Sequence, residues 1–257
     1  MIGIIGLGKM GTAIAGRLYK NGLEVIAKDK KETSVAGVQA AKDYCELAGC
    51  EALLFCVKPL DLRAAAAEIK SAIEKRGKHP LLISIAAGKS LSWLEAEFGN
   101  ERIIRAMPNL AATAGKSFTC FSVNSQVSTA DVKLAESVFS AFGSCLQVEE
   151  ALLDAVTAIS GSGPAYFLYF ARALAKAGVS AGLDKELADL LARRTLIGVS
   201  AIAEDAPSTF DELIASIATP GGTTEAALGV FEQDGMEKII SNAVHAAKER
   251  CEALAQK

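Results

Sequence analysis

A glycine-rich segment behind an apolar run at the start of the chain constrains the fold more than any other feature. Ile2–Leu7 is almost continuously apolar and leads through Gly6-Leu-Gly-Lys-Met-Gly11 into Lys9–Lys20, whose apolar side chains recur at helical spacing. Between a strand and a helix, this spacing of glycines predicts a dinucleotide site, because the turn is tight and the backbone can approach a pyrophosphate. The alternative is that the glycines serve only the turn. We expect the cofactor to contact Gly6, Leu7, Gly8, Lys9, Met10 and Gly11.

Residues 1–150 alternate strand-like and helix-like segments, which is typical of a parallel sheet covered by helices on both faces. The predicted strands are Ile2–Leu7, Leu23–Ala27, Ala52–Val57, Leu81–Ile85, Ile103–Ala106, Ser117–Val123 and Ser144–Val148. The predicted helices are Lys9–Lys20, Ser34–Val38, Leu62–Arg76, Ser90–Phe98 and Thr129–Phe142, the last with Ser128 as N-cap.

Strand signals vanish after residue 150. The predicted helices there are Ala151–Ala158, Ala165–Ala177, Lys185–Ala203, Thr209–Ile217, Thr224–Gln233 and Met236–Ala255. The expected fold class is therefore α/β: a doubly wound, Rossmann-type sheet over residues 1–150, then an all-α domain over residues 151–257.

Charge and cysteine usage exclude several classes of protein. The net charge is −3 and there is no basic stripe, so we expect no nucleic-acid partner. The six cysteines form no C-x-x-C pair and indicate a reducing compartment, so we expect a cytoplasmic protein without a metal site. The start of the chain lacks a signal-peptide pattern. The longest uncharged run, Ala155–Ala171, contains Ser-Gly-Ser-Gly-Pro, so we expect no membrane span.

The choice of cofactor depends on the end of the second predicted strand, where an acidic residue binds ribose hydroxyls or a basic one binds a 2′-phosphate. The sequence there, Ala27-Lys-Asp-Lys-Lys31, offers both, and the candidate cofactor contacts in it are Lys28, Asp29 and Lys30. The lysines favour NADP, and Asp29 keeps NAD possible. A solvated corner of the domain is the alternative interpretation of this charge run.

Three later loops leave the carboxyl ends of predicted strands, where ligands of open α/β sheets bind. Each carries small residues, a proline or one polar group, as a crevice for a flat nicotinamide ring needs. The alternative is that Pro59 and Pro108 only end the strands. The candidate cofactor contacts in these loops are Cys56, Val57, Lys58, Pro59, Ala86, Ala87, Met107 and Asn109.

Two loops of the helical half stand out. Ser160-Gly-Ser-Gly-Pro-Ala-Tyr166 interrupts a helical stretch and indicates a kinked domain junction or an active-site hinge. Thr219-Pro-Gly-Gly-Thr-Thr224 precedes a helix that we expect to begin near Glu225, and its amides and hydroxyls suit a substrate carboxylate. The simpler alternative is that Thr223 or Thr224 only caps that helix.

Together these segments resemble the pyrroline-5-carboxylate reductase family. The resemblance covers nearly the whole chain. It rests on the Ile-Gly-Ile-Ile-Gly-Leu-Gly-Lys-Met-Gly start, Val57-Lys-Pro59, Arg105-Ala-Met-Pro-Asn109, Asp154-Ala-Val-Thr-Ala-Ile-Ser-Gly-Ser-Gly-Pro-Ala-Tyr166 and Thr219-Pro-Gly-Gly-Thr-Thr224. The last two motifs are specific to that family, and the first is shared with many dehydrogenases. The family usually has Ser where this chain has Thr219, which keeps a hydroxyl.

The resemblance implies hydride transfer from NAD(P)H to the C=N carbon of 1-pyrroline-5-carboxylate, which yields L-proline, the last step of proline biosynthesis. It places Thr224 at the ring nitrogen as the catalytic residue. The backbone of Gly221, Gly222, Thr223 and Thr224 would hold the carboxylate, and Glu204 would add a more distant polar group. It also implies a homodimer formed through the helical domains, which in some family members assembles further into a decamer.

Two other functions fit parts of the sequence. A 3-hydroxyisobutyrate-type dehydrogenase shares the glycine-rich start, but its Gly-x-Gly-x-x-x-Lys motif has Phe167 here in place of the general-base lysine. A regulator that senses NAD(P) without turnover would share the glycine-rich loop but would not need the Thr219–Thr224 loop. The chain has two histidines, and reduction of a protonated imine needs none.

Overall fold

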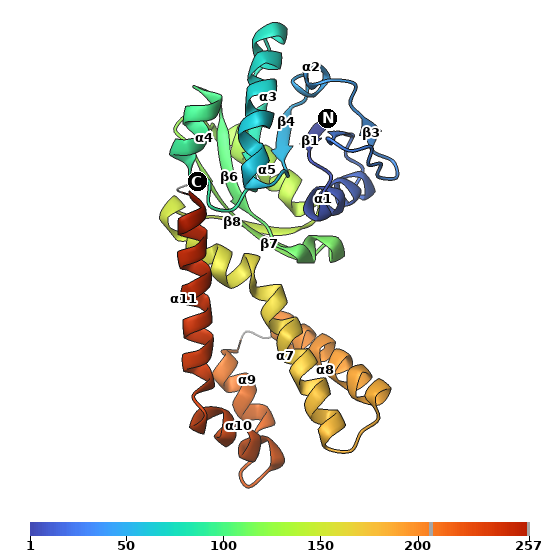
Figure 1. The fold of residues 1–257 in the computed structure, drawn as a ribbon, viewed down its shortest axis with the longest axis vertical. Helices are drawn as coiled ribbons and strands as arrows, with labels where there is room; N and C mark the ends of the chain where they lie inside the picture. The colour runs from blue at the N-terminus through green and yellow to red at the C-terminus, as the bar shows by residue number, and fades with distance from the viewer. Residues whose placement is uncertain (206–207, 256–257) are drawn as a thin grey trace. The chain divides into compact units, whose positions relative to one another are not determined.

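The computed structural model describes residues 1–205 and 208–255 (Figure 1). The chain divides into two compact units, one formed by Met1–Pro164 with Ala246–Lys257 and the other by Ala165–His245. The predicted domains, 1–150 and 151–257, differ from these units. The first unit also holds the segment just after residue 150 and the end of the chain. A domain boundary at residue 150 stays a prediction.

The first unit is built on one eight-stranded sheet of order β3-β2-β1-β4-β5-β6-β7-β8. Its β1, β2, β4 and β5 are buried nearly throughout, which explains their continuous apolar sequences. The Rossmann-type fold is confirmed. The strands are β1 Ile2–Ile5, β2 Val25–Lys28, β3 Gln39–Ala40, β4 Ala52–Phe55, β5 Leu81–Ser84, β6 Ile103–Met107, β7 Ser117–Val123 and β8 Gly143–Gln147.

One strand departs from the expected all-parallel arrangement. β7 runs antiparallel to β6, with Ala106 opposite Phe121, whereas β8 is again parallel to β7. Only the short 3₁₀ turn Leu110–Ala114 lies between β6 and β7, which is too little chain for a crossover helix. The expectation of a wholly parallel sheet is therefore wrong at this strand.

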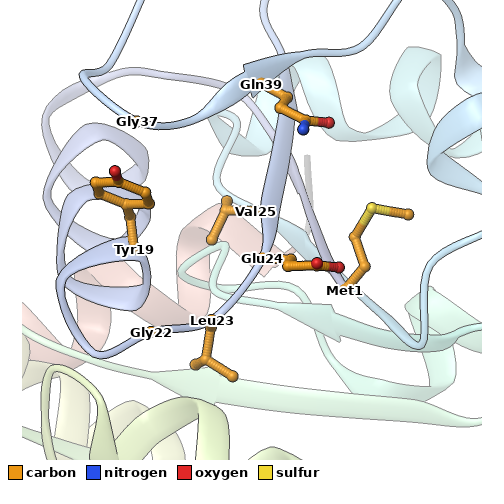
Figure 2. Close-up of a pocket in the computed structure, with 8 residues that line it drawn as sticks. All are labelled: Met1, Tyr19, Gly22, Leu23, Glu24, Val25, Gly37 and Gln39. Carbon is orange, nitrogen blue, oxygen red and sulfur yellow. The ribbon is translucent and has the colours of Figure 1, made fainter.

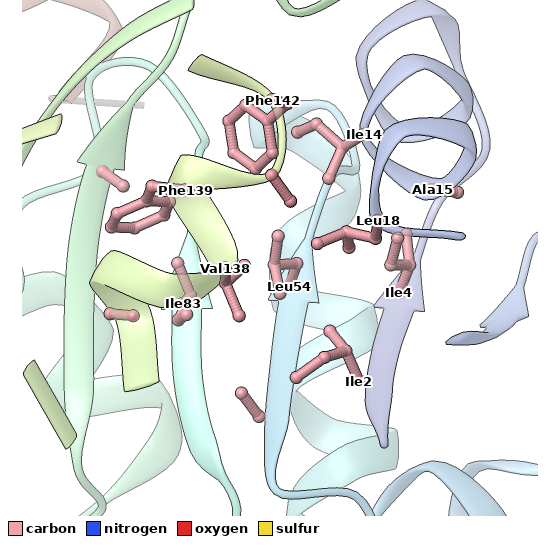
Figure 3. Packing of buried hydrophobic residues seen from close by; sticks show 14 of the residues in the cluster. Ile2, Ile4, Ile14, Ala15, Leu18, Leu54, Ile83, Val138, Phe139 and Phe142 are labelled. Atoms are coloured by element: carbon pink, nitrogen blue, oxygen red, sulfur yellow. The ribbon is translucent and has the colours of Figure 1, made fainter. Parts of the chain in front are cut away.

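Alternating residues of the central strands build two separate apolar cores. Ile2 and Ile4 of β1 lie in a core with side chains of α1 and α5, shown in Figure 3. Ile5 of β1 and Phe55 of β4 lie in a second core with side chains of α2, α3 and α4. Helices therefore cover both faces of the sheet, as the alternating sequence predicted.

Four of the five helices predicted within residues 1–150 are confirmed, with ends shifted by at most two residues. The helix predicted at Ala151–Ala158 is instead a 3₁₀ turn, the short helix α6 and the start of a π-helical turn in succession. Ser128 caps α5 in a capping box with Asp131, as predicted. Burial raises the pKa of Asp131, but hydrogen bonds from Ser128 and the charge of Arg102 together lower it by a larger amount. The pKa of Asp131 therefore lies below its ordinary value. The helices are α1 Lys9–Lys20, α2 Tyr44–Leu47, α3 Leu62–Arg76, α4 Leu91–Phe98, α5 Thr129–Ser140 and α6 Leu153–Val156.

The predicted helix at Ser34–Val38 is wrong. These residues form an irregular segment with a turn at Ala36–Gly37, and the chain then enters the short strand β3. Gly37 has a φ of 79°, and a Cβ there would overlap the Tyr19 ring. A stretch of five residues forms too few helical hydrogen bonds to offset the free-energy cost of helix nucleation. The left-handed conformation of Gly37 also prevents a helix from continuing through it.

The second unit contains only helices among the residues that the structure describes. The predicted interruption at Ser160–Tyr166 is a change of helical pitch: the π-helical turn Thr157–Gly161 precedes α7. Thr209 caps α9 in a capping box with Glu212. The helices are α7 Gly163–Ser180, α8 Lys185–Asp205, α9 Phe210–Ile217, α10 Thr223–Gln233 and α11 Met236–Ala255; α7 begins and α11 ends in the first unit.

Candidate functional site

A cavity of about 560 Å³ opens at the carboxyl ends of β1, β2 and β4. The loop after β1 supplies one wall, and the segment after β2 and the start of α3 supply others. This is where an open α/β sheet binds ligands. Its lining residues are Ile5, Gly6, Leu7, Gly8, Lys28, Asp29, Lys30, Lys31, Thr33, Tyr44, Cys56, Val57, Lys58, Asp61, Ala64, Ala65 and Glu68.

The glycine-rich loop has the shape that a pyrophosphate needs. Gly6 has a φ of 95°, and a Cβ on Gly11 would overlap the Gly6 carbonyl oxygen, so these two glycines serve the turn and the helix–strand packing. A Cβ on Gly8 would meet no protein atom within 4 Å. Gly8 is also the N-cap of α1, and no side chain among the described residues caps that helix. An anion can therefore reach the first amides of α1.

Hydrogen bonds attach the end of β2 to this loop. The Asp29 carboxylate accepts from the Leu7 amide at 2.5 Å and from the Lys31 amide at 2.8 Å. Lys28 donates to the Lys42 carbonyl oxygen at 3.1 Å, with its Nζ 5.7 Å from the centroid of the Tyr44 ring. Burial raises the pKa of the Tyr44 hydroxyl. The cluster of lysines that the sequence indicated thus lines one wall of the cavity.

Opposite these lysines, the connection after β4 supplies a carboxylate. Asp61 accepts a hydrogen bond from Lys30 at 2.6 Å. The pair raises the pKa of the Lys30 ammonium and lowers that of Asp61, mainly through this hydrogen bond. The lining residues that the sequence did not indicate as cofactor contacts are Ile5, Thr33, Tyr44, Asp61, Ala64, Ala65 and Glu68. Asp61 stands two residues beyond the Val57-Lys-Pro59 motif, and that proximity was the one available signal.

Several predicted cofactor residues lie outside the cavity wall: Lys9, Met10, Gly11, Pro59, Ala86, Ala87, Met107 and Asn109. Met107 is 7% exposed and packs with Cys120 and Leu153. The Asn109 side chain donates to the Ser160 hydroxyl at 3.1 Å and accepts from the Ala111 amide. The structure thus gives both residues packing or hydrogen-bonding roles, and their contact with a cofactor stays a prediction.

Arg105 of β6 forms ion pairs with the chain just after β8, where the helices begin. Its guanidinium, 7% exposed, pairs with Glu150 at 3.1 Å and with Asp154 at 2.5 Å. Glu150 also accepts from the Leu91 amide, at the start of α4. The Cys251 thiol donates to Asp154 at 3.4 Å. This part-buried network joins β6, α4, α6 and the end of α11.

The predicted substrate loop, Thr219–Thr224, lies in the second unit. Gly222, not a threonine, caps α10, so the interpretation of Thr223 or Thr224 as the N-cap is wrong. The Gly222 amide donates to the Thr219 carbonyl oxygen at 2.9 Å. The Gly221 amide donates at 2.7 Å to the Glu225 carboxylate, a contact that sequence reasoning missed. Glu204 lies at the exposed end of α8, and its predicted role stays untested.

A second cavity, of about 300 Å³, lies at the amino ends of β1 and β2 (Figure 2). Met1, Glu24 and Val25 line it from the strand starts, and Tyr19 and Gly37 line it from α1 and the following turn. The amino ends of parallel strands are not where open α/β sheets bind dinucleotides. The cavity at the carboxyl ends is therefore the candidate cofactor site.

Two classes of feature are missing from the described ranges. Within residues 1–205 and 208–255, helices fall short of the length and apolarity needed to cross a membrane. The same residues contain no group of three or more His, Cys, Asp or Glu side chains placed to hold a metal ion.

The chain is similar to known proteins over its whole length. Residues 150–254 match a family model described as pyrroline-5-carboxylate reductase dimerisation, and residues 1–88 match one described as NADP oxidoreductase, coenzyme F420-dependent. A pyrroline-5-carboxylate reductase from Synechocystis is 36% identical, with 100% of this chain and 98% of the relative covered.

Solved structures agree with these sequence relationships. A pyrroline-5-carboxylate reductase from Coxiella burnetii superposes with a TM-score of 0.89 at 30% identity and covers 100% of this chain and 98% of its own. A Plasmodium falciparum pyrroline carboxylate reductase with NADP bound has a TM-score of 0.86 at 30% identity and covers 99% and 97%.

Proposed function

The chain belongs to the pyrroline-5-carboxylate reductase family, and from that membership we propose that it reduces 1-pyrroline-5-carboxylate to L-proline with NADPH. The observation that carries this proposal is the relationship over the entire chain, which includes both the sheet unit and the helical unit. The enzyme is accordingly an oxidoreductase acting on a C=N bond.

The cavity at the carboxyl ends of the strands fits a dinucleotide phosphate. The open space above Gly8 and the first amides of α1 suit the pyrophosphate, and Lys30 and Lys31 line the wall where an adenosine 2′-phosphate would bind. When bound, NADPH supplies the hydride that the C=N carbon receives. The protein's part is to fix the position of the nicotinamide and to limit the access of water.

We assign the substrate to the Thr219–Thr224 loop. Thr224 lies in the first turn of α10, and because Gly222 is the N-cap its hydroxyl is not used for capping. We expect this hydroxyl to contact the ring nitrogen and orient the imine. A protonated imine already carries its proton, so hydride addition gives the amine without a general acid. Correct orientation is worth about 7 kcal/mol in well-aligned intramolecular reactions.

Glu225 affects how this loop meets an anionic substrate. Its carboxylate already accepts the Gly221 amide, and the Gly222 amide is used within the loop. A substrate carboxylate therefore has the amides of Thr223 and Thr224 available, or it displaces Glu225 from Gly221. Both arrangements keep the substrate at the N-terminal end of α10, where the helix dipole favours an anion.

The helical unit carries a dimerisation domain, so the protein forms homo-oligomers. Large apolar side chains on α7, among them Phe167, Leu168 and Tyr169, are each more than 60% exposed in the single chain, as expected of a surface that a second copy covers. We propose a homodimer formed through this unit, its further assembly into a decamer, and a cytoplasmic location. Light scattering of the purified protein measures the assembly.

The activity is tested by mixing the protein with 1-pyrroline-5-carboxylate and NADPH, and separately NADH, while recording nicotinamide absorbance. We expect loss of absorbance that depends on the imine and is faster with NADPH. A protein that binds NADPH without consuming it would instead be a sensor of the cofactor. Activity on 3-hydroxyisobutyrate with NADP⁺ would support the dehydrogenase alternative, which requires a lysine where Phe167 stands.

A further inference from the structure

The three lysines at the end of β2 are not equivalent. Lys28 is engaged with the Lys42 carbonyl oxygen and the face of Tyr44, so its ammonium is directed toward α2. Lys30 is paired with Asp61, and Lys31 lines the cavity beside it. A 2′-phosphate on the adenosine ribose needs a cation at this strand end. Lys30 is placed where such a phosphate would bind, and it already has a carboxylate partner.

Asp29 does not compete with Asp61 for Lys30. Its two carboxylate oxygens accept the amides of Leu7 and Lys31, so it joins the glycine-rich loop to the end of β2. This connection keeps Lys30 next to the loop that would hold the pyrophosphate. The acidic residue that opposes a phosphate at this position is thus Asp61, which comes from a different connection, after β4.

The Lys30–Asp61 pair contributes little to folding. The two side chains are 67% and 41% exposed, and water and salt screen ion pairs with such exposure. The pair does, however, place a negative charge within 2.6 Å of the cation that a 2′-phosphate requires. A phosphate dianion near Lys30 must either repel Asp61 or take Lys30 from it.

We propose that Asp61 is a specificity-determining residue that lowers the affinity for the 2′-phosphate of NADPH by holding Lys30. This inference rests on the proposed use of NADPH and on the cavity as its site. Asp61 reduces the preference for NADPH over NADH without contacting the nicotinamide end of the cofactor. Neutralising it leaves Lys30 for the phosphate.

The test uses binding of the fragment 2′,5′-ADP, measured by titration calorimetry on the full-length protein, with 5′-AMP as the matched ligand that lacks the 2′-phosphate. Asp61→Asn should lower the Kd for 2′,5′-ADP about 3- to 10-fold and change that for 5′-AMP less than about twofold. The gain should shrink at about 1 M NaCl, where the Debye length is about 3 Å.

Two further variants separate this mechanism from a general effect of charge. Glu97→Gln removes a carboxylate from the Arg63–Glu97 pair, which lies outside the cavity, and should leave both affinities unchanged. In a Lys30→Gln background, Asp61→Asn should change 2′,5′-ADP binding less than about twofold, because Asp61 acts through Lys30.

An unchanged or higher Kd in Asp61→Asn overturns the inference, as does an effect of full size in the Lys30→Gln background. If the unmodified protein binds 2′,5′-ADP no more tightly than 5′-AMP, the premise of a 2′-phosphate site fails instead. The absorbance assay with NADPH and the imine reports separately on the proposed activity.

Discussion

Two glycines of the same loop should respond in opposite ways to one added methyl group. A Cβ on Gly8 meets no protein atom within 4 Å, whereas a Cβ on Gly11 overlaps the Gly6 carbonyl oxygen and lies 3.0 Å from its carbon. Gly8 therefore leaves space for a ligand, and Gly11 permits α1 to pack on β1. The substitutions Gly8→Ala and Gly11→Ala separate these two roles.

The stability of Gly8→Ala should stay within about 0.5 kcal/mol of the unmodified protein. Alanine is the poorer N-cap by about 0.5–1 kcal/mol, but it restricts the unfolded chain by about 0.4–1 kcal/mol, and Gly8 has a φ of −69°, which alanine adopts readily. Gly11→Ala should lose about 1–3 kcal/mol from overpacking. Urea unfolding followed by the single tryptophan, Trp93 on α4, measures both values in the first unit.

The effect of Gly8→Ala on cofactor binding should be large. The methyl group occupies the space above the first amides of α1 and would displace one charged hydrogen bond to the pyrophosphate, which is worth about 1.5–3 kcal/mol. The Kd for NADPH should therefore rise about 10- to 150-fold. A Kd within twofold of the unmodified protein, at unchanged stability, would refute the assignment of the pyrophosphate to this loop.

Three further substitutions test other parts of the account. Thr224→Ala should lower kcat at least about tenfold with little change in the Kd for NADPH. Unchanged steady-state kinetics would contradict a catalytic role for Thr224. Arg105→Met should lower the free energy of unfolding in urea by about 3 kcal/mol, because it leaves two part-buried carboxylates without their cation. Arg193→Met, at an exposed pair, should leave the free energy of unfolding nearly unchanged, and equal losses in the two variants would contradict the stabilising role of Arg105. Asp131→Asn should cost about 1–2 kcal/mol near neutral pH. The pKa of Asp131 is lower in the folded protein than in the unfolded chain, so its charge stabilises the fold above about pH 3.9. The stability difference between Asp131→Asn and the unmodified protein should therefore vanish as the pH falls below that value and through the folded-state pKa. A difference independent of pH would show that the charge of Asp131 is not its cause.

Local sequence signals predicted most of the architecture. The apolar run before the glycines, the Ser128 cap and the alternation of strand and helix each depend on residues close in sequence, and each is confirmed. The two failures have different causes. Ser34–Val38 has a weakly helical composition, but Gly37 lies against the Tyr19 ring, which only the folded chain brings there. β7 runs antiparallel to β6 because the connection between them is too short for a crossover helix.

The candidate site was predictable at the glycine-rich loop and less so elsewhere. Spacing alone located Gly8 and the charged end of β2. It could not reveal that Asp61 pairs with Lys30, because these residues follow β4 and β2, which come together only when both strands pair with β1. Similarly, the Thr219–Thr224 motif indicated an anion-binding loop, but not that Glu225 accepts one of its amides.

The proposed reaction delivers a hydride from NADPH to the C=N carbon of 1-pyrroline-5-carboxylate. The most direct measurement supplies NADPH deuterated at the transferring carbon of the nicotinamide and examines the product by mass spectrometry and NMR. We expect L-proline with deuterium at the former imine carbon. Proline without deuterium at that carbon, or deuterated cofactor that is bound but not consumed, would contradict it.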